Sequence, residues 1–301
     1  MQFAAVATIL PRLLPSWVLA HDALIIQPWQ NGNKWKARVN GIEKTWAWLK
    51  KRRDANRHPP APHYWQIFAI VAANLVVLSL LIFDTAVGET RPAGPFARAL
   101  GELITDFGSS GWILIASAIL LFEGLSSFRL SRSVKRRFRA LYAAQIGAYF
   151  FLAVALSGLS ANVLKRVIGR ARPSQFDEWG AFGLSPFSGS KFESFPSGHS
   201  TTVGAIFMVL ILLLPRYRLA FILLALWMGF SRVMVSAHYP SDVIAGLSYG
   251  AWFSLLLANI FARYRLVFMP DAKGWPVPRL SLIPLQQLPP DPLGKPFRTG
   301  N

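Results

Sequence analysis

An uncharged stretch of twenty residues, Tyr64–Phe83, constrains this chain more than any other feature of its sequence. A helix of that length spans the ~30 Å hydrocarbon core of a bilayer. Further apolar segments follow it: Phe107–Phe122, Leu141–Leu164, Ser200–Leu214, Leu219–Ser231 and Val243–Ala262. Because 53% of the residues are hydrophobic and only 15% are charged, the composition is also that of a membrane protein. We therefore predict an all-α, polytopic membrane protein with six transmembrane helices.

The six segments define a membrane domain over residues 64–262, with an extension on each side. Residues 1–63 form a basic N-terminal extension, and apolar residues within 34–57 fall on one helical face: Trp35, Val39, Ile42, Trp46 and Leu49. Such a basic helix lies either on an anionic membrane surface or against the rest of the protein. Residues 263–301 are predicted to be an irregular cytoplasmic tail, because most of this stretch is rich in proline and lacks periodicity.

The distribution of Lys and Arg predicts the orientation in the membrane. Ten precede the first apolar segment, two lie in 84–106, six lie in 126–139 and six follow the last segment. Cytoplasmic loops accumulate these residues, so both termini and 126–139 are predicted to be cytoplasmic. The segments 165–199 and 232–242 then share the opposite side, although 165–199 holds five Lys/Arg that need another explanation. The net charge of +18 accordingly indicates contact with anionic lipid and not with nucleic acid.

Three polar clusters lie on this predicted non-cytoplasmic side. They are Lys165-x6-Arg172-Pro173, Pro196-Ser197-Gly198-His199 and Ser231-Arg232-x5-His238-x3-Asp242. Taken singly, each has an ordinary interpretation as headgroup anchors, a helix start or an acid at a helix N-terminus. A phosphate ester, however, needs cations and N–H donors around its oxygens, a nucleophile and an acid for the leaving group. Together the clusters supply all of these on one face of the membrane.

The third cluster holds the predicted nucleophile. Pro240 fits the first position of the last helix, so Asp242 in the first turn can reach back to a ring nitrogen of His238. That contact would fix the tautomer and raise the basicity of the other nitrogen, which attacks phosphorus. His199, at a helix start, can protonate the leaving alkoxide, and the planar fork of Arg232 suits phosphate oxygens.

In these clusters the sequence resembles the type 2 phosphatidic acid phosphatase superfamily, whose three-part signature they match at every position. The resemblance implies that His238 forms a phosphohistidine, that Asp242 is its partner and that His199 is the leaving-group acid. It implies a phosphate-binding group made of Lys165, Arg172, Ser197, Gly198 and Arg232. It also implies that no metal ion or other cofactor is needed, and the chain has no cysteine to provide thiolate ligands.

The resemblance implies a membrane phosphatase for the phosphate monoester or diphosphate of a lipid. The substrate classes are lipid A, phosphatidate, phosphatidylglycerophosphate and polyprenyl diphosphate. Alternatives are a lipid phosphotransferase with the same site and a non-catalytic lipid-binding or transport protein on this scaffold. A third is a soluble vanadate-dependent haloperoxidase, against which the apolar segments argue.

The expected partners are the lipid phosphate and membrane lipids, with no nucleic acid, and the oligomeric state is left open. The basic cytoplasmic face, the small size and the absence of cysteine suit a bacterial inner membrane with a periplasmic active site.

Single-cysteine variants test the predicted topology, because the native chain has no cysteine. Ser188→Cys should react with a membrane-impermeant thiol reagent in intact cells, since segment 165–199 is predicted to be non-cytoplasmic. Ser131→Cys should react only after the cells are opened. The reverse labelling pattern would invert the topology.

Overall fold

The computed structural model describes residues 43, 46–47, 49–54, 64–90 and 94–280. The chain divides into two compact units, Met1–Lys50 and Lys51–Asn301. In the first unit all the described residues are helical, in agreement with the helix expected over 34–57. Trp35, Val39 and Ile42, which define the apolar face of that helix, lie outside the described residues.

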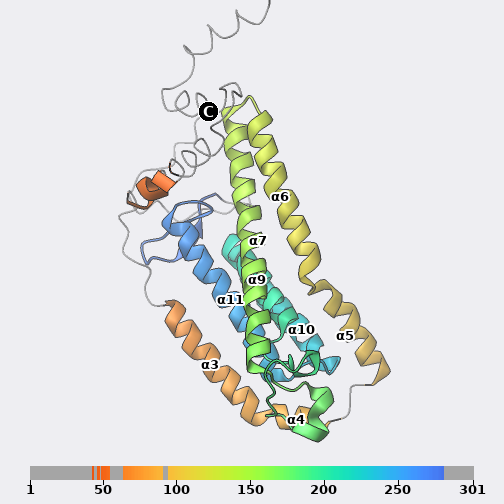
Figure 1. The fold of residues 1–301 in the computed structure, drawn as a ribbon. Coiled ribbons are helices and arrows are strands. Elements are labelled where there is room, and N and C mark those ends of the chain that lie inside the picture. The colour runs from red at the N-terminus through yellow and green to blue at the C-terminus, as the bar shows by residue number, and fades with distance from the viewer. Residues whose placement is uncertain (1–42, 44–45, 48, 55–63, 91–93, 281–301) are drawn as a thin grey trace, which may run out of the picture. The chain divides into compact units, whose positions relative to one another are not determined.

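Five stretches of the described chain are helical, long and apolar enough to cross a membrane, which confirms a polytopic helical membrane protein. They contain α3 (Tyr64–Ile82), α6 (Ser110–Leu130), α7 (Val134–Ile168), α10 (Arg218–Met234) and α11 (Pro240–Arg263), all seen in Figure 1. The remaining predicted span, Ser200–Leu214, corresponds to α9 (Gly198–Leu213), which has 16 residues and is shorter than these. Six spans are therefore not confirmed, and the orientation of the termini stays a prediction.

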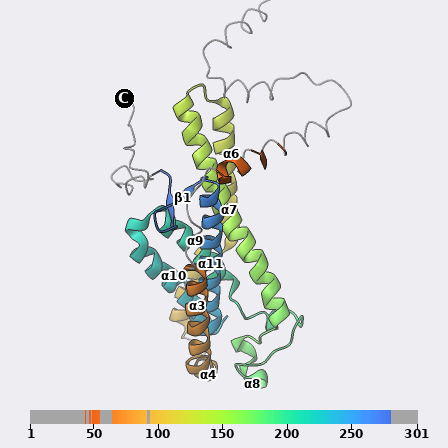
Figure 2. The same ribbon diagram turned by 90° about the vertical axis from the view of Figure 1, so that its left-hand side faces the viewer.

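Two of the predicted loops contain further helices. The loop after α3 holds α4 (Asp84–Glu89) and α5 (Pro95–Phe107), and the loop after α7 holds α8 (Phe176–Trp179). Short 3-10 turns lie in the connections between α7 and α10: η2 (Pro173–Gln175), η3 (Ser190–Phe192) and η4 (Pro215–Tyr217). In Figures 1 and 2, α4 and α8 lie at the same end of the helices, at the foot of α3 and α7.

The helices α6 and α7 form a long antiparallel pair. With 35 residues α7 is about 52 Å long at 1.5 Å per residue, so it extends beyond the hydrocarbon core. The two backbones approach closely, because a Cβ at Gly147 would lie 2.6 Å from the backbone nitrogen of Leu121. Small residues allow such close packing between membrane helices, where lipid provides no hydrophobic drive for association.

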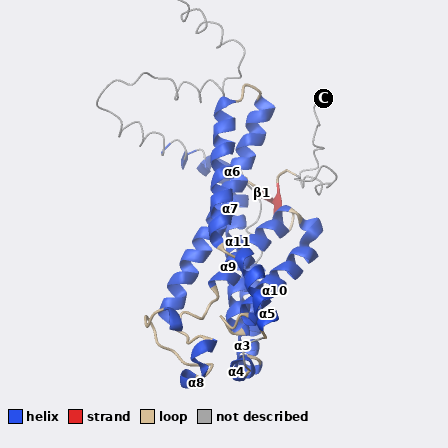
Figure 3. Cartoon of the chain, turned by 90° about the vertical axis from the view of Figure 1, so that its right-hand side faces the viewer, coloured by secondary structure: helices blue, strands red, loops and turns tan. Residues whose placement is uncertain are grey.

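A small sheet follows α11, where an irregular tail was predicted. It pairs β1 (Phe268–Pro270) with β2 (Pro276–Pro278) in antiparallel fashion, with Phe268 opposite Pro278. Figure 3 shows β1 among the helices. The all-α prediction misses these strands because their prolines are normally turn and loop signals.

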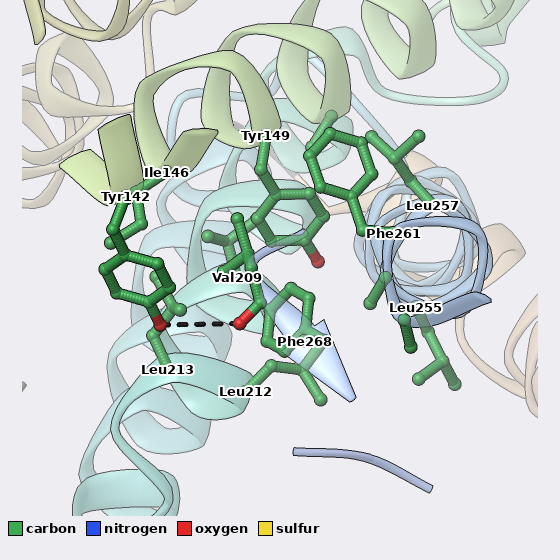
Figure 4. Close-up of a cluster of buried hydrophobic side chains, with 14 residues drawn as sticks. Tyr142, Ile146, Tyr149, Val209, Leu212, Leu213, Leu255, Leu257, Phe261 and Phe268 are labelled. Atoms are coloured by element: carbon green, nitrogen blue, oxygen red, sulfur yellow. Dashed lines mark hydrogen bonds between the residues drawn. The ribbon is translucent and has the colours of Figure 1, made fainter. Parts of the chain in front are cut away.

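The largest buried cluster lies where this sheet meets α7, α9 and α11. Figure 4 shows Tyr142, Ile146, Tyr149, Val209, Leu212, Leu213, Leu255, Leu257, Phe261 and Phe268. The side chain of Tyr149 is fully buried, and its hydroxyl donates to the carbonyl of Ser254 at 2.8 Å. The hydroxyl of Tyr142 donates to the carbonyl of Val267 at 3.4 Å. This apolar core fixes α7, α9 and α11 at one end and leaves their other ends for polar groups.

Candidate active site

The helices α9 and α11 bring the second and third polar clusters together. A Cβ at Gly246 would lie 2.5 Å from the carbonyl oxygen of Ser197, so only glycine permits this approach of the two helices. The backbone N–H of Ser197 donates to the carbonyl of Asp242 at 3.1 Å. The two clusters are therefore joined through their backbones.

His238 is buried, and its ring is oriented by a carbonyl group. Its side chain lies just before α11, with Nδ1 2.9 Å from the carbonyl oxygen of Ser194. A carbonyl oxygen only accepts hydrogen bonds, so Nδ1 carries the hydrogen and Nε2 keeps a free lone pair. This is the tautomer that a nucleophilic Nε2 requires.

The predicted contact between Asp242 and His238 is less direct than expected. Nδ1 of His238 lies 3.7 Å from Oδ2 of Asp242, an ion-pair separation beyond hydrogen-bond length. Oδ2 instead accepts from the hydroxyl of Ser194 at 2.6 Å and from the backbone N–H of Tyr239 at 2.9 Å. Ser194 thus links the two residues, with its hydroxyl to the carboxylate and its carbonyl to the imidazole.

Burial and nearby charges set the protonation of His238. Burial lowers the pKa of His238 below its ordinary value, and the carboxylate of Asp242 offsets part of this effect. The guanidinium groups of Arg172 and Arg232 lower the pKa further. The ring is therefore neutral at physiological pH and available for attack.

The three clusters predicted from the sequence meet around His199, in the first turn of α9. Burial lowers the pKa of His199 to about 4, and Arg232, His238, Lys165 and Arg172 contribute to this shift because they lie close to its imidazole. These side chains come from α7, from the loop that follows it, from α10 and from the turn before α11. The structure therefore gathers the predicted catalytic and phosphate-binding residues at one place.

Each cation is held in position with donors to spare. Arg172 donates through Nε to a backbone carbonyl of the loop at 2.9 Å, and Nζ of Lys165 lies 3.9 Å from Glu193. Arg232 donates through Nη1 to the hydroxyl of Thr105 at 3.2 Å. Its buried Nε has no hydrogen-bond partner among the described residues. A buried donor of this kind suits an anion that has yet to bind.

The N-terminus of α9 faces the same cations. Ser197 is its N-cap residue, and its hydroxyl oxygen accepts from the N–H of Ser200 at 3.4 Å. A Cβ at Gly198 would lie 3.5 Å from Nζ of Lys165, so the ammonium group lies close to the start of the helix. Free N–H groups at a helix start bind phosphate oxygens.

A buried arginine that the sequence reasoning missed lies behind His238. Arg170 is 3% exposed, with Nη1 2.5 Å from Oδ1 of Asp242 and Nη2 2.7 Å from Oδ2 of Asp84. Its guanidinium carbon is 4.5 Å from the ring centre of Tyr239. Burial alone would lower the pKa of Arg170, but Asp242 and Asp84 outweigh it and hold the pKa above its ordinary value.

Asp84 is the other residue that was missed. It begins α4, is fully buried and accepts from the backbone N–H of Ser241 at 3.1 Å and from the hydroxyl of the same residue. One signal was available: Asp84 is the acid that ends the uncharged stretch Tyr64–Phe83, and ionisable residues at membrane depth indicate function. Arg170 is one of the six unspecified positions between Lys165 and Arg172, and it gives no such signal.

The described residues contain no group of three or more His, Cys, Asp or Glu side chains arranged to hold a metal ion. The site instead combines two imidazoles with cationic side chains and a helix N-terminus. It can bind a phosphate group, attack it through Nε2 of His238 and protonate a leaving oxygen.

Comparisons with known proteins identify relatives of this chain. A model of the PAP2 superfamily matches residues 146–265, which contain all three clusters. A "Lipid A 1-phosphatase" from Rhizobium johnstonii is 52% identical over 233 residues, covering 77% of this chain and 95% of that protein. One from Rhizobium etli is 53% identical, covering 72% and 93%. A "Decaprenylphosphoryl-5-phosphoribose phosphatase" from Mycolicibacterium smegmatis is 35% identical, covering 50% and 69%.

Proposed function

This chain belongs to the PAP2 superfamily as a lipid phosphate phosphatase, and from that premise we propose that it removes a phosphate group from lipid A through a phosphohistidine. The substrate is supported by the two Rhizobium relatives, which match the chain over 95% and 93% of their lengths. The mechanism rests on one observation: Nδ1 of His238 is held by a carbonyl, which leaves Nε2 free beside the cations. We place this site on the periplasmic face of the inner membrane.

In the first step the phosphate group moves from lipid to protein. Lys165, Arg172 and Arg232 bind the non-bridging oxygens together with the start of α9. The negative charge of the bound phosphate group offsets the cations that lower the pKa of His199, so this ring takes up a proton from solvent. Nε2 of His238 attacks phosphorus, the bond between phosphorus and the lipid oxygen breaks, and His199 gives that oxygen its proton. The products are a lipid hydroxyl and a phosphohistidine.

In the second step water completes the hydrolysis. His199, now neutral, takes a proton from a water molecule, whose oxygen attacks phosphorus and releases inorganic phosphate and His238. The carboxylate of Asp242 stabilises the positive charge that the ring of His238 carries in the intermediate. Cationic side chains supply the charge that a divalent metal ion supplies in other phosphatases, so we propose a metal-independent reaction.

An apolar cavity next to the catalytic segment supports a lipid substrate. Its volume is about 450 Å³, and it lies between α3, α7 and α11. Its lining includes Ala69, Ala72, Leu164, Ile168, Ala245 and Trp252. It also reaches the dipeptide Phe195–Pro196. This dipeptide lies between Ser194, whose carbonyl orients His238, and Ser197, which caps α9. We place a hydrocarbon chain of the substrate in this cavity, because its volume is typical of a ligand site and its lining excludes the phosphate group.

Purified protein should release inorganic phosphate from lipid A in excess chelator, because no metal ion takes part. Release should be slower from phosphatidate, phosphatidylglycerophosphate and undecaprenyl diphosphate. Loss of activity in chelator and recovery with one divalent ion would contradict the metal-free mechanism. Appearance of the phosphate on a second lipid would indicate a phosphotransferase.

The two histidines should respond differently to substitution. His238→Ala should abolish turnover of every substrate, because the covalent route is lost. His199→Ala should reduce turnover of the lipid by about 10²–10⁴-fold but reduce that of nitrophenyl phosphate less, since this leaving group needs no proton. Rapid quenching in an alkaline denaturant, in which phosphohistidine survives, should trap a phosphoenzyme in His199→Ala and never in His238→Ala. Label on His238→Ala would refute the assignment.

Filling the cavity should impair long-chain substrates selectively. Ala72→Phe places a ring where the chain should lie, so kcat/KM for lipid A should fall by about tenfold or more, the scale of one misfit group in an apolar pocket. The value for nitrophenyl phosphate should stay within about twofold. The matched control is Ala116→Phe on the exposed face of α6, which should change neither value. Equal behaviour of the two variants would remove the cavity from the substrate site.

A further inference from the structure

Two carboxylates share one guanidinium behind the predicted nucleophile. Arg170 contacts Asp242 at 2.5 Å and Asp84 at 2.7 Å, and all three side chains are buried. Asp84 only accepts hydrogen bonds: Arg170 donates through Nη2, and Ser241 donates through its backbone N–H and its hydroxyl. This is the pattern of an ionised carboxylate. Arg170, Asp84 and Asp242 together therefore carry one negative charge. Arg170 and a single aspartate would already be electrically neutral, so the second acid adds a charge in excess.

The position of the second carboxylate explains this excess charge. His238 needs negative charge on its Nδ1 side when Nε2 bonds to phosphorus, because the ring then becomes cationic. Asp242 is the nearest source, at 3.7 Å, but a guanidinium at 2.5 Å from its other oxygen opposes that effect. Asp84 binds the Nη2 side of the same guanidinium and also receives the hydroxyl of Ser241, to which Nη1 donates. The charge of Arg170 is thus divided between two acids.

We propose that Asp84 is a positioning residue for the reaction, which acts through Arg170 to leave Asp242 with the negative charge that His238 requires. This proposal rests on the proposed function, in which His238 is the nucleophile. Asp84 touches neither the substrate nor the imidazole, so its effect concerns the rate of phosphoryl transfer and leaves phosphate binding unchanged.

If Asp84 served only the stability of the fold, its substitution would lower the stability and the activity together. Breaking a buried ion pair destabilises a protein mainly when it leaves a buried charge without a partner. Asp84→Asn keeps the shape of the side chain and leaves Arg170 and Asp242 as a balanced pair. Folding should therefore survive this substitution, whereas catalysis should not.

The test compares Asp84→Asn with Glu89→Gln, which removes an exposed acid from the same helix α4. For Asp84→Asn we expect kcat to fall by about 10–100-fold, the usual size of a lost interaction with a nearby charge. KM and the inhibition constant of inorganic phosphate should stay within about threefold, and the protein should stay folded at the assay temperature, with a Tm loss no larger than that of one or two unmade buried hydrogen bonds. Glu89→Gln should match the wild-type protein. A kcat of Asp84→Asn within twofold of wild type, or a parallel loss of phosphate binding, would overturn the proposal.

A second variant tests the same idea by restoring the negative charge. Asp84→Glu keeps a carboxylate beside Arg170, whereas Asp84→Asn removes the charge. The kcat of Asp84→Glu should exceed that of Asp84→Asn, or stay within about tenfold of wild type if the asparagine variant fails to fold. A folded Asp84→Glu protein that is no more active than Asp84→Asn, or that is inactive where Asp84→Asn is unfolded, refutes the role of Asp84. If wild-type protein releases no phosphate from lipid, or if His238→Ala keeps its activity, the proposed function itself fails.

Discussion

The buried contact of Arg170 with Asp84 and Asp242 holds the whole catalytic end of this protein together. Each of these groups would be costly to bury alone, and a change that leaves one buried charge without any partner typically costs about 3–5 kcal/mol. That is a large part of the roughly 5–15 kcal/mol that stabilises a folded domain. The start of α11, the loop after α7 and the start of α4 are therefore positioned by one guanidinium.

The site is built in two layers upon this contact. The inner layer fixes Asp242, which with Ser194 sets the tautomer and orientation of His238. The outer layer gathers the cations and the start of α9 around the proposed phosphate site. The packing of α9 against α11 at Gly246 makes both layers part of one rigid unit, so the proposed nucleophile and the proposed anion site keep their separation. Electrostatic preorganisation of this kind provides much of the catalytic power of enzymes.

The sequence was informative where physical constraints act over short distances. Apolar length predicts α3, α7 and α11, and the spacing of His238 and Asp242 predicts that they lie near each other at the start of a helix. The sequence does not predict that Ser194 lies between them, because a carbonyl group has no residue signature. Arg170 and Asp84 were missed for a related reason: their pairing depends on a loop whose path no periodicity describes. The sheet of β1 and β2 was missed because its prolines usually mark turns.

The ion pair between Asp84 and Arg170 has a consequence for biosynthesis. Asp84 follows the first membrane helix of the domain, whereas Ser241 and Asp242 begin the last one, and the bond from Ser241 to Asp84 joins residues 157 positions apart. A chain emerging from the ribosome therefore lacks the contact of Arg170 with both acids until its final helix has been inserted and has met the first. Assembly of this buried charge arrangement therefore coincides with closure of the helical domain, and it depends on the last helix to be synthesised.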